Sequence, residues 1–155
     1  MNKLVFDSPI GKIAVFAENG FIVRAEIKTK EKTDGEITEK LLFEAEKQLS
    51  EYFDGKRRAF ELPLKFSGTE FQKSVWNELE KIPFGKTKTY GEIAAAIGKT
   101  KAARAVGGAC NKNPLVIIVP CHRVIGAGGK LGGFACGTDT KEWLLGHEAD
   151  DKKGE

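Results

Sequence analysis

The chain has 155 residues, 41% of them hydrophobic, which is enough to form one compact core or two small lobes. Its net charge is only +3, and no apolar run approaches the roughly 20 residues that a membrane-spanning helix needs. The first residues lack a basic stretch followed by a long apolar one, so we expect no signal peptide. The composition therefore points away from membrane and secreted proteins and predicts a cytoplasmic one.

Cysteine and histidine are few in this chain: Cys110, Cys121, Cys136, His122 and His147. An odd number of cysteines without close pairing argues against a disulfide framework and fits a reducing compartment. A structural zinc site usually takes four Cys or His ligands in two close pairs, which these positions do not offer. We therefore expect no metal site.

Basic side chains are concentrated in one part of the chain. Residues 1–65 carry 12 basic and 12 acidic residues, whereas residues 84–130 carry eight basic residues and one acidic residue. Such asymmetry is typical of a protein that binds a polyanion. A solvated surface with counterions would give the same count, so charge alone leaves both interpretations open.

Residues 1–65 have the pattern of a small α/β scaffold domain. Three apolar runs predict strands, at residues 4–6, 13–16 and 21–23. Asn19-Gly20 between two of these runs predicts a type I′ hairpin turn. Apolar residues then recur at helical spacing from Ile37 to Phe53, and Asp54-Gly55 ends that helix. We expect an antiparallel sheet with one helix, and we find no chemical motif here.

Residues 66–149 have the pattern of a mainly helical second domain, with a charged tail over 150–155. Thr69 and Gln72 form a capping box, in which each side chain satisfies a free N–H at the start of a helix. Thr89 and Glu92 form a second capping box. Together the two regions predict an α/β protein, with a small antiparallel sheet domain before a helical domain.

A helix-turn-helix is expected inside the basic region. The helix that starts at Thr89 runs through Ile97, Gly98 ends it, and a third helix covers about 100–110. The third helix would be the one presented to DNA. Its small side chains would also suit close packing inside the protein, and composition alone does not separate these interpretations.

After the third helix, the apolar run Leu115–Val119 predicts a buried strand that leads to Cys121. A Gly-rich stretch follows at 126–137, and a last helix runs from Thr138 to near Glu148. We expect three neighbouring apolar residues on the buried side of this helix, namely Trp143, Leu144 and Leu145.

Cys121 is the candidate nucleophile, because His122 and Arg123 follow it directly. A free thiol has a pKa of about 8.5, and a neighbouring base or positive charge can activate it. A carboxylate on the outer nitrogen of His122 would hold its tautomer, and Glu148 is a candidate for that carboxylate. A Cys-His pair is weak evidence by itself, since free cysteines are commonly buried structural residues.

The run Ile118–Ile125 has the sequence IVPCHRVI. It is accompanied by IPFG at 82–85, TYGEIA at 89–94, KAARAVGGA at 101–109, Asn113-Pro114 and KEWLL at 141–145. In this order the segments resemble those of the O6-alkylguanine-DNA alkyltransferases, also called methylated-DNA–protein-cysteine methyltransferases, and the first run resembles their active-site segment. The match covers roughly residues 66–149. Residues 1–65 are similar in kind to the family's N-terminal α/β domain.

The resemblance implies direct-reversal DNA repair. The alkyl group of O6-alkylguanine, and also of O4-alkylthymine, in double-stranded DNA would move once and irreversibly to Cys121. His122 would act as general base through a water, and Glu148 would orient it. Tyr90 would hydrogen-bond the flipped guanine and help protonate the leaving base, and Asn113 would brace the turn that shapes the pocket.

The resemblance also implies a DNA interface and a guanine pocket. Arg104 would enter the duplex and fill the gap left by the extruded nucleotide. DNA contacts are expected from Thr89, Tyr90, Ala103, Arg104 and Arg123, and pocket contacts from Val124, Phe134, Ala135 and Cys136. The protein would act as a monomer without a cofactor, and in a prokaryote it would be found with the nucleoid.

Two positions depart from the family pattern. Phe134 stands where Tyr is frequent, which puts one polar pocket contact in doubt. Cys136 stands where Gly is common, and it could narrow the pocket against bulky adducts such as O6-benzylguanine. Plainer roles stay open for four residues, namely packing for Tyr90, solvation for Glu148, turn formation for Asn113 and phosphate contact for Arg104.

Two other functional classes are compatible with parts of the sequence. A non-catalytic DNA-binding module that regulates or senses damage would use the helix-turn-helix, but family members that only sense damage lack the cysteine. A Cys-His hydrolase would need an oxyanion hole and an open cleft, which the sequence neither shows nor excludes. The products distinguish the classes, because a hydrolase turns over, a sensor leaves Cys121 free, and an alkyltransferase ends with one alkyl group on Cys121.

Overall fold

The computed structural model describes residues 1–153, with side chains as far as Ala149. The chain forms two compact units: Met1–Phe66 with Pro114–Val116, and Ser67–Asn113 with the segment that begins at Ile117. The predicted α/β class is confirmed, with a three-stranded antiparallel sheet and a helix in the first unit and a mainly helical second unit. Within the described residues, no helix is both long and apolar enough to cross a membrane.

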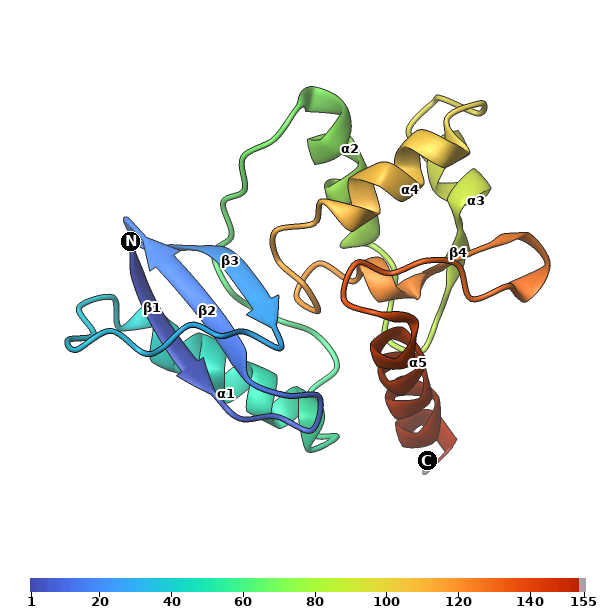
Figure 1. The fold of residues 1–155 in the computed structure, drawn as a ribbon. Coiled ribbons are helices and arrows are strands. Elements are labelled where there is room, and N and C mark those ends of the chain that lie inside the picture. The colour runs from blue at the N-terminus through green and yellow to red at the C-terminus, as the bar shows by residue number, and fades with distance from the viewer. Residues whose placement is uncertain (154–155) are drawn as a thin grey trace. The chain divides into compact units, whose positions relative to one another are not determined.

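The first unit is an antiparallel sheet of β1 (Asn2–Phe6), β2 (Ile13–Glu18) and β3 (Phe21–Ile27), covered by helix α1 (Leu41–Phe53) (Figure 1). The β2–β3 hairpin confirms the predicted turn, because Asn19 and Gly20 both have positive φ, 52° and 82°. Every residue of β2 except Glu18 is buried, so this central strand forms the middle of the core.

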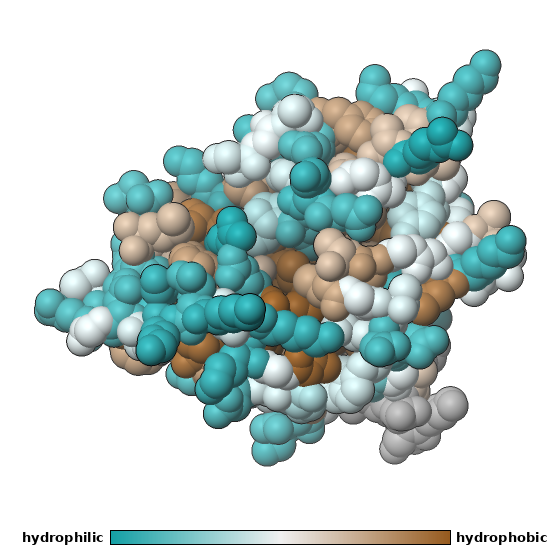
Figure 2. All heavy atoms as spheres, in the orientation of Figure 1, coloured by the Kyte–Doolittle hydropathy of each residue, from teal (hydrophilic) through white to brown (hydrophobic). Residues whose placement is uncertain are grey.

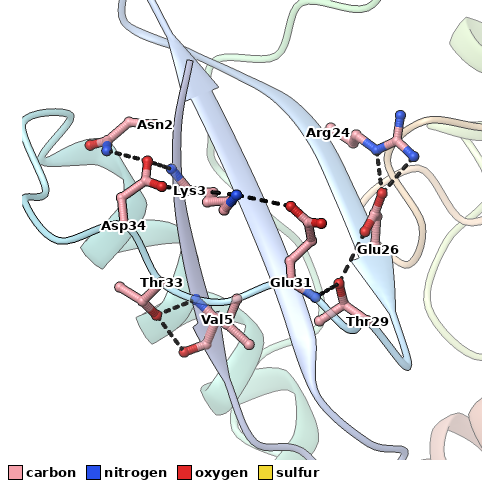
Figure 3. Close-up of polar contacts among 9 residues, drawn as sticks. All are labelled: Asn2, Lys3, Val5, Arg24, Glu26, Thr29, Glu31, Thr33 and Asp34. Carbon is pink, nitrogen blue, oxygen red and sulfur yellow. Dashed lines mark hydrogen bonds and ion pairs between the residues drawn. The ribbon is translucent and has the colours of Figure 1, made fainter.

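The loop before α1 is fixed along β1, and this corrects the predicted start of the helix at Ile37. Asp34 accepts hydrogen bonds from the side chain of Asn2 and the backbone N–H of Lys3, at 2.9 and 3.0 Å (Figure 3). The side-chain oxygen of Asn2 accepts from the backbone N–H groups of Thr38 and Glu39, at 2.7 and 3.1 Å. These bonds hold the segment in a non-helical conformation until Leu41.

The second unit begins with α2 (Glu70–Leu79) and continues through β4 (Lys88–Thr89), α3 (Tyr90–Ala96) and α4 (Ala103–Asn111). The capping boxes of Thr69 with Gln72 and of Thr89 with Glu92 are both present. Helices α2, α3 and α4 contact one another, and the indole N–H of Trp76 donates to the carbonyl oxygen of Ala109 at 2.9 Å. Helix α4 starts later than predicted, because residues 98–102 form turns.

The predicted strand at Leu115–Val119 is wrong, because turn residues 117 and 118 interrupt the run and only isolated bridge residues occur in it, at Leu115, Val116 and Val119. Leu115 makes a single parallel bridge with Ala25 of β3, and Ile117 then has a φ of 75°, which is incompatible with an extended strand. The chain turns and enters η1 (Cys121–Arg123), a short 3-10 helix, before β5 (Val124–Ile125) pairs in parallel with β4. Cys121 therefore lies on a turn and not at the end of a strand.

The last elements are η2 (Ala127–Gly129) and helix α5 (Thr138–Lys153), which contacts η1. The prediction that α5 ends near Glu148 is wrong, because no Gly or Pro follows until Gly154. The rest of the predicted tail, residues 154–155, lies outside the described residues. On the face drawn in Figure 2, hydrophilic residues cover most of the surface.

The buried face of α5 also differs from the expected one. Trp143 and Leu145 are only partly buried. The residues that are nearly inaccessible recur at three- to four-residue spacing, at Lys141, Leu144 and Glu148. Two of these three carry charge, so this helix contributes charged side chains to the interior of the second unit.

Candidate active site

Cys121 lies at the start of η1 and is 4% exposed. The side-chain amide of Asn113 donates to the Cys121 Sγ at 3.1 Å and to the carbonyl oxygen of Val119 at 2.8 Å. Asn113 thus braces the turn between residues 113 and 121 and touches the thiol with the same group, as expected. Burial raises the pKa of Cys121 to about 11, against the opposing effect of the Asn113 hydrogen bond.

His122 is completely buried, and its Nε2 lies 2.7 Å from the Oε2 of Glu148 on α5. Its other ring nitrogen, Nδ1, is buried and makes no hydrogen bond within the part of the chain that the structure describes. Burial lowers the pKa of His122, although the hydrogen bond and charge of Glu148 act in the other direction. The structure therefore brings Cys121, His122 and Glu148 together, although Cys121 and Glu148 are 27 positions apart.

Arg123 does not fit the expectation that it contacts DNA. It is 6% exposed, and its Nε and one terminal nitrogen donate to Oε1 and Oε2 of Glu148, at 2.9 and 3.1 Å. The other terminal nitrogen donates to the carbonyl oxygen of Ile82 at 2.7 Å. Because its guanidinium is used inside the protein, Arg123 is corrected to an internal partner of Glu148.

Glu148 is the buried centre of this network, with 1% exposure, so the interpretation of it as a solvated residue is excluded. Its Oε1 also accepts from the backbone N–H of Gly85 at 3.3 Å. Burial alone would raise the pKa of Glu148, but the hydrogen bonds and charges of His122 and Arg123 hold it well below its usual range. The carboxylate is therefore ionised at neutral pH.

Tyr90 and Lys141 form a second polar group in the same unit. The Nζ of Lys141 lies 3.4 Å from the Tyr90 hydroxyl, and it donates to the carbonyl oxygen of Gly133 at 3.2 Å. Burial lowers the pKa of Lys141 and raises that of Tyr90. Both side chains interact electrostatically with Cys121 and with Cys110, whose burial raises its own pKa to about 12. The acceptor candidate is thus close to a phenol and an ammonium group.

A pocket of about 630 Å³ opens where α3 and α4 meet the Gly-rich loop. Four residues expected at the DNA interface line it, namely Thr89, Tyr90, Ala103 and Arg104. The rest of the wall comes from α3, α4 and the Gly-rich loop, with the residues Gly91, Gly107, Gly108, Asn111, Ala127 and Gly133. The small side chains of α4, which left two interpretations open, therefore leave room beside Tyr90.

Comparison with known proteins identifies the family. Residues 1–66 match the model of the 6-O-methylguanine DNA methyltransferase ribonuclease-like domain, and residues 70–150 match that of the DNA binding domain of the same methyltransferases. The chain belongs to this family.

Individual members of the methyltransferase family are similar over nearly the whole chain. The methylated-DNA–protein-cysteine methyltransferase of Methanosarcina acetivorans is 52% identical, over 94% of this chain and 96% of the relative. The constitutive enzyme of Bacillus subtilis is 43% identical over 90% of each chain. The structure of Mycobacterium tuberculosis OGT in complex with DNA has a TM-score of 0.89 at 40% identity, and it covers 97% of this chain and 94% of that one.

The pocket residues expected from the methyltransferase resemblance are placed less directly. Val124 is fully buried, Phe134 and Cys136 are half-buried, and Ala135 is exposed. Cys136 interacts electrostatically with Cys121, so this part of the Gly-rich loop lies near the thiol. None of these four side chains is among those that line the 630 Å³ pocket, so their role in guanine binding stays a prediction.

Lys141 is the residue of this methyltransferase site that sequence reasoning missed. It is completely buried, although lysine is rarely buried without a partner. A signal was present, because Lys141 and Leu144 precede Glu148 at helical spacing, and Glu148 was already expected to point inward.

Proposed function

We propose that this chain repairs DNA by taking the alkyl group from O6 of guanine onto Cys121, once per molecule. The family's reaction is the transfer of a methyl group from O6-methylguanine in DNA to a protein cysteine. The observation that carries the choice of cysteine is the buried arrangement around Cys121. Its thiol accepts a hydrogen bond from Asn113 and lies next to His122, whose Nε2 is fixed on Glu148.

The resting thiol needs a base, because its pKa of about 11 keeps it protonated near neutral pH. His122 is that base. Glu148 fixes the proton of the neutral ring on Nε2, and this leaves the Nδ1 lone pair to take the thiol proton through a bridging water. The imidazolium that forms is stabilised by the Glu148 carboxylate.

The transfer itself is an in-line displacement at the alkyl carbon. The Sγ–C bond forms as the C–O6 bond breaks, and the electron pair of the broken bond stays on guanine. Tyr90 protonates or hydrogen-bonds the leaving base, and Lys141 holds its hydroxyl in place. The product is a thioether without a good leaving group, so the protein acts once and needs no cofactor.

The target carbon lies inside the base stack, so the nucleotide has to be turned out of the duplex. Arg104 is exposed on α4 at the mouth of the pocket and fills the gap that the extruded nucleotide leaves. Thr89 and Ala103 contact the DNA beside it. The basic residues within 84–130 supply the general attraction to phosphate, so the affinity for DNA falls with salt.

The protein works as a monomer, and O4-alkylthymine is a further substrate.

The intact mass of the protein after mixing with excess duplex containing one O6-methylguanine tests this proposal. We expect a gain of one methyl group per chain, located on Cys121 and lost in Cys121→Ser. A methyl group on Cys110 or Cys136 would overturn the assignment of the acceptor. An unchanged mass with the duplex still bound would favour a damage sensor, which the helix-turn-helix and the basic region would also suit.

A further inference from the structure

Arg123 is joined to Glu148 by two hydrogen bonds and belongs to the same turn as Cys121 and His122. We infer that Arg123 is a positioning residue for alkyl transfer, which sets the orientation and the charge balance of Glu148 and thereby keeps His122 a neutral base. This inference rests on the proposed function, because it assigns a task to His122. It replaces the expected contact of Arg123 with DNA.

The geometry leaves Glu148 little freedom to rotate. Arg123 is bonded to both carboxylate oxygens, and the oxygen that faces His122 is the one that accepts from a terminal nitrogen of Arg123. A forked guanidinium on a carboxylate fixes the plane of the acid as well as its distance. The remaining Arg123 nitrogen is fixed on the carbonyl oxygen of Ile82, so the arginine is itself held. The plane of Glu148, and with it the imidazole of His122, is therefore set by Arg123.

The charges lead to the same conclusion. Buried Glu148 faces two basic groups, but one of them, Arg123, is always charged. The arginine therefore neutralises the carboxylate, and the completely buried imidazole of His122 can stay uncharged. Without Arg123, the buried carboxylate would lose a permanently charged partner, and it would favour the imidazolium of His122 more strongly. An imidazolium cannot take the proton of Cys121.

Among the residues that the structure describes, few other charged groups act on His122. Glu148 and Lys141 face it from α5, and Arg123 and the Cys121 thiol belong to its own turn. Helix α2 also contacts this turn, but the buried side chains of α2 are Val75, Trp76 and Leu79, which are uncharged. Lys141 and Arg123 both oppose the protonation of His122, and only Arg123 is in contact with Glu148.

Two variants separate the effect of the Arg123 charge from the effect of its two hydrogen bonds to the Glu148 carboxylate. Arg123→Met removes both, whereas Arg123→Lys keeps a charge but cannot bond both oxygens in one plane. Transfer should slow at low pH as His122 becomes protonated, and we call this part of the pH–rate profile the acid limb. In Arg123→Met we expect the midpoint of the acid limb to lie about one pH unit higher than in the wild type, so that transfer below it is about tenfold slower. In Arg123→Lys the limb should return toward the wild-type position, while the plateau at high pH stays below that of the wild type.

The experiment measures single-turnover transfer from an O6-methylguanine duplex between pH 5.5 and 9, by the intact mass of the full chain. Val75→Ala, in the core of the same unit, is the control for lost stability, and its limb should stay at the wild-type pH. Overlapping limbs for Arg123→Met and the wild type would overturn the inference, as would an equal shift in Val75→Ala. If the wild type itself puts no methyl group on Cys121, the proposed function fails instead.

If Arg123→Met does not fold, Arg123→Lys still decides the question. A plateau equal to that of the wild type would show that the fork has no effect on transfer. A lower rate plateau in Arg123→Lys, with the acid limb at the wild-type pH, would support the inference. DNA affinity is measured separately with an unmodified duplex, and it should be the same for Arg123→Lys and the wild type. A loss of DNA affinity in Arg123→Lys would restore the original interpretation of this residue as a DNA contact.

Discussion

The ammonium nitrogen of Lys141 lies 3.4 Å from the hydroxyl of Tyr90 and 3.2 Å from the carbonyl oxygen of Gly133, and the side chain is completely buried. A single lysine therefore connects α5 with the start of α3 and with the Gly-rich loop. Its ring-facing position, 5.7 Å from the centroid of Tyr90, adds a cation–π contact. Tyr90 is thus fixed by a charge that itself lies in the interior.

We expect Lys141→Met to separate stability from activity. Methionine fills much of the same volume without a buried charge, so the free energy of unfolding should be unchanged or higher by about 1 kcal/mol. The rate of methyl transfer should fall by about tenfold or more, because Tyr90 loses the group that orients it. Urea unfolding and the single-turnover rate check the two parts. A lysine that only supports the fold would give lower stability together with an unchanged rate.

Gly132 and Gly128 offer a matched pair of substitutions. Both have positive φ, 75° and 74°, so alanine strains the backbone equally at either position. At Gly132, however, the new methyl group would lie 2.8 Å from the Tyr90 hydroxyl, whereas nothing lies within 4 Å at Gly128. Gly132→Ala should therefore displace Tyr90 and slow transfer, and Gly128→Ala should cost only stability. Equal transfer rates in the two variants would remove Tyr90 from the reaction.

Asn113 performs two tasks with one amide, and Asn113→Ala should affect both. The Val119 carbonyl oxygen loses its buried donor, which costs about 1–3 kcal/mol of stability. The thiol of Cys121 also loses a hydrogen bond that lowers its pKa, so the pKa rises further and transfer slows at neutral pH. Thermal unfolding and the transfer rate are the measurements. If stability falls while the rate holds, Asn113 is only a turn former.

The sequence pattern was sufficient where local rules decide the structure. The Asn19-Gly20 hairpin and the capping boxes of Thr69 and Thr89 depend on neighbouring residues, and all three are confirmed. The chemistry of thiol activation made Glu148 a candidate partner of His122, although no local rule connects the two positions. The roles of Tyr90, Asn113 and Arg104 came from the family resemblance. The class of protein is now shown by the family models, whereas the individual roles stay proposals.

The sequence pattern failed where distant contacts decide. The start of α1 moved to Leu41 because Asn2, more than 30 positions earlier, bonds the segment in front of it. Arg123 was expected to contact DNA, but its partner is a carboxylate on α5, 25 positions later in the sequence. The apolar run before Cys121 looked like a strand, and only the backbone shows the positive φ at Ile117. Each failure involves a partner or a dihedral angle that hydrophobic periodicity does not contain.

Glu148 should make stability depend on pH in a defined window. Its pKa in the folded protein is well below that in the unfolded chain, so its contribution is complete above about pH 4.5 and is lost as the pH falls toward the folded pKa. Glu148→Gln should cost about 3–5 kcal/mol at pH 7, because Arg123 loses its buried counter-ion. The difference between the wild-type and variant stabilities should shrink as the pH falls below about 4.5, and it should be smaller at pH 3 than at pH 7.

The control for that measurement is Glu142→Gln, an exposed position on the same helix. It should change the unfolding free energy by less than about 0.5 kcal/mol at any pH. Two parallel curves for Glu148→Gln and the wild type from pH 7 to 3 would contradict the role of the carboxylate as a buried anion.

Cys136 should influence which adducts the protein accepts. It is half-buried in the Gly-rich loop and interacts electrostatically with Cys121. We expect Cys136→Gly to react faster with O6-benzylguanine, while its reaction with O6-methylguanine changes little, because only the bulky group needs the extra space. The ratio of the two inactivation rates is the readout. The same ratio in both proteins would show that Cys136 does not limit the pocket.

The segment Pro114–Val116 belongs to the first unit although it follows α4 in sequence. The backbone of Ala25 bonds with both ends of it, since its N–H donates to Pro114 at 2.8 Å and its carbonyl oxygen accepts from Val116 at 3.3 Å. During synthesis on the ribosome, β3 therefore cannot form its hydrogen bonds with Pro114 and Val116 until most of the chain has been made. The N-terminal unit is completed late in synthesis, and a nascent chain stalled before residue 114 would leave this edge of β3 unpaired.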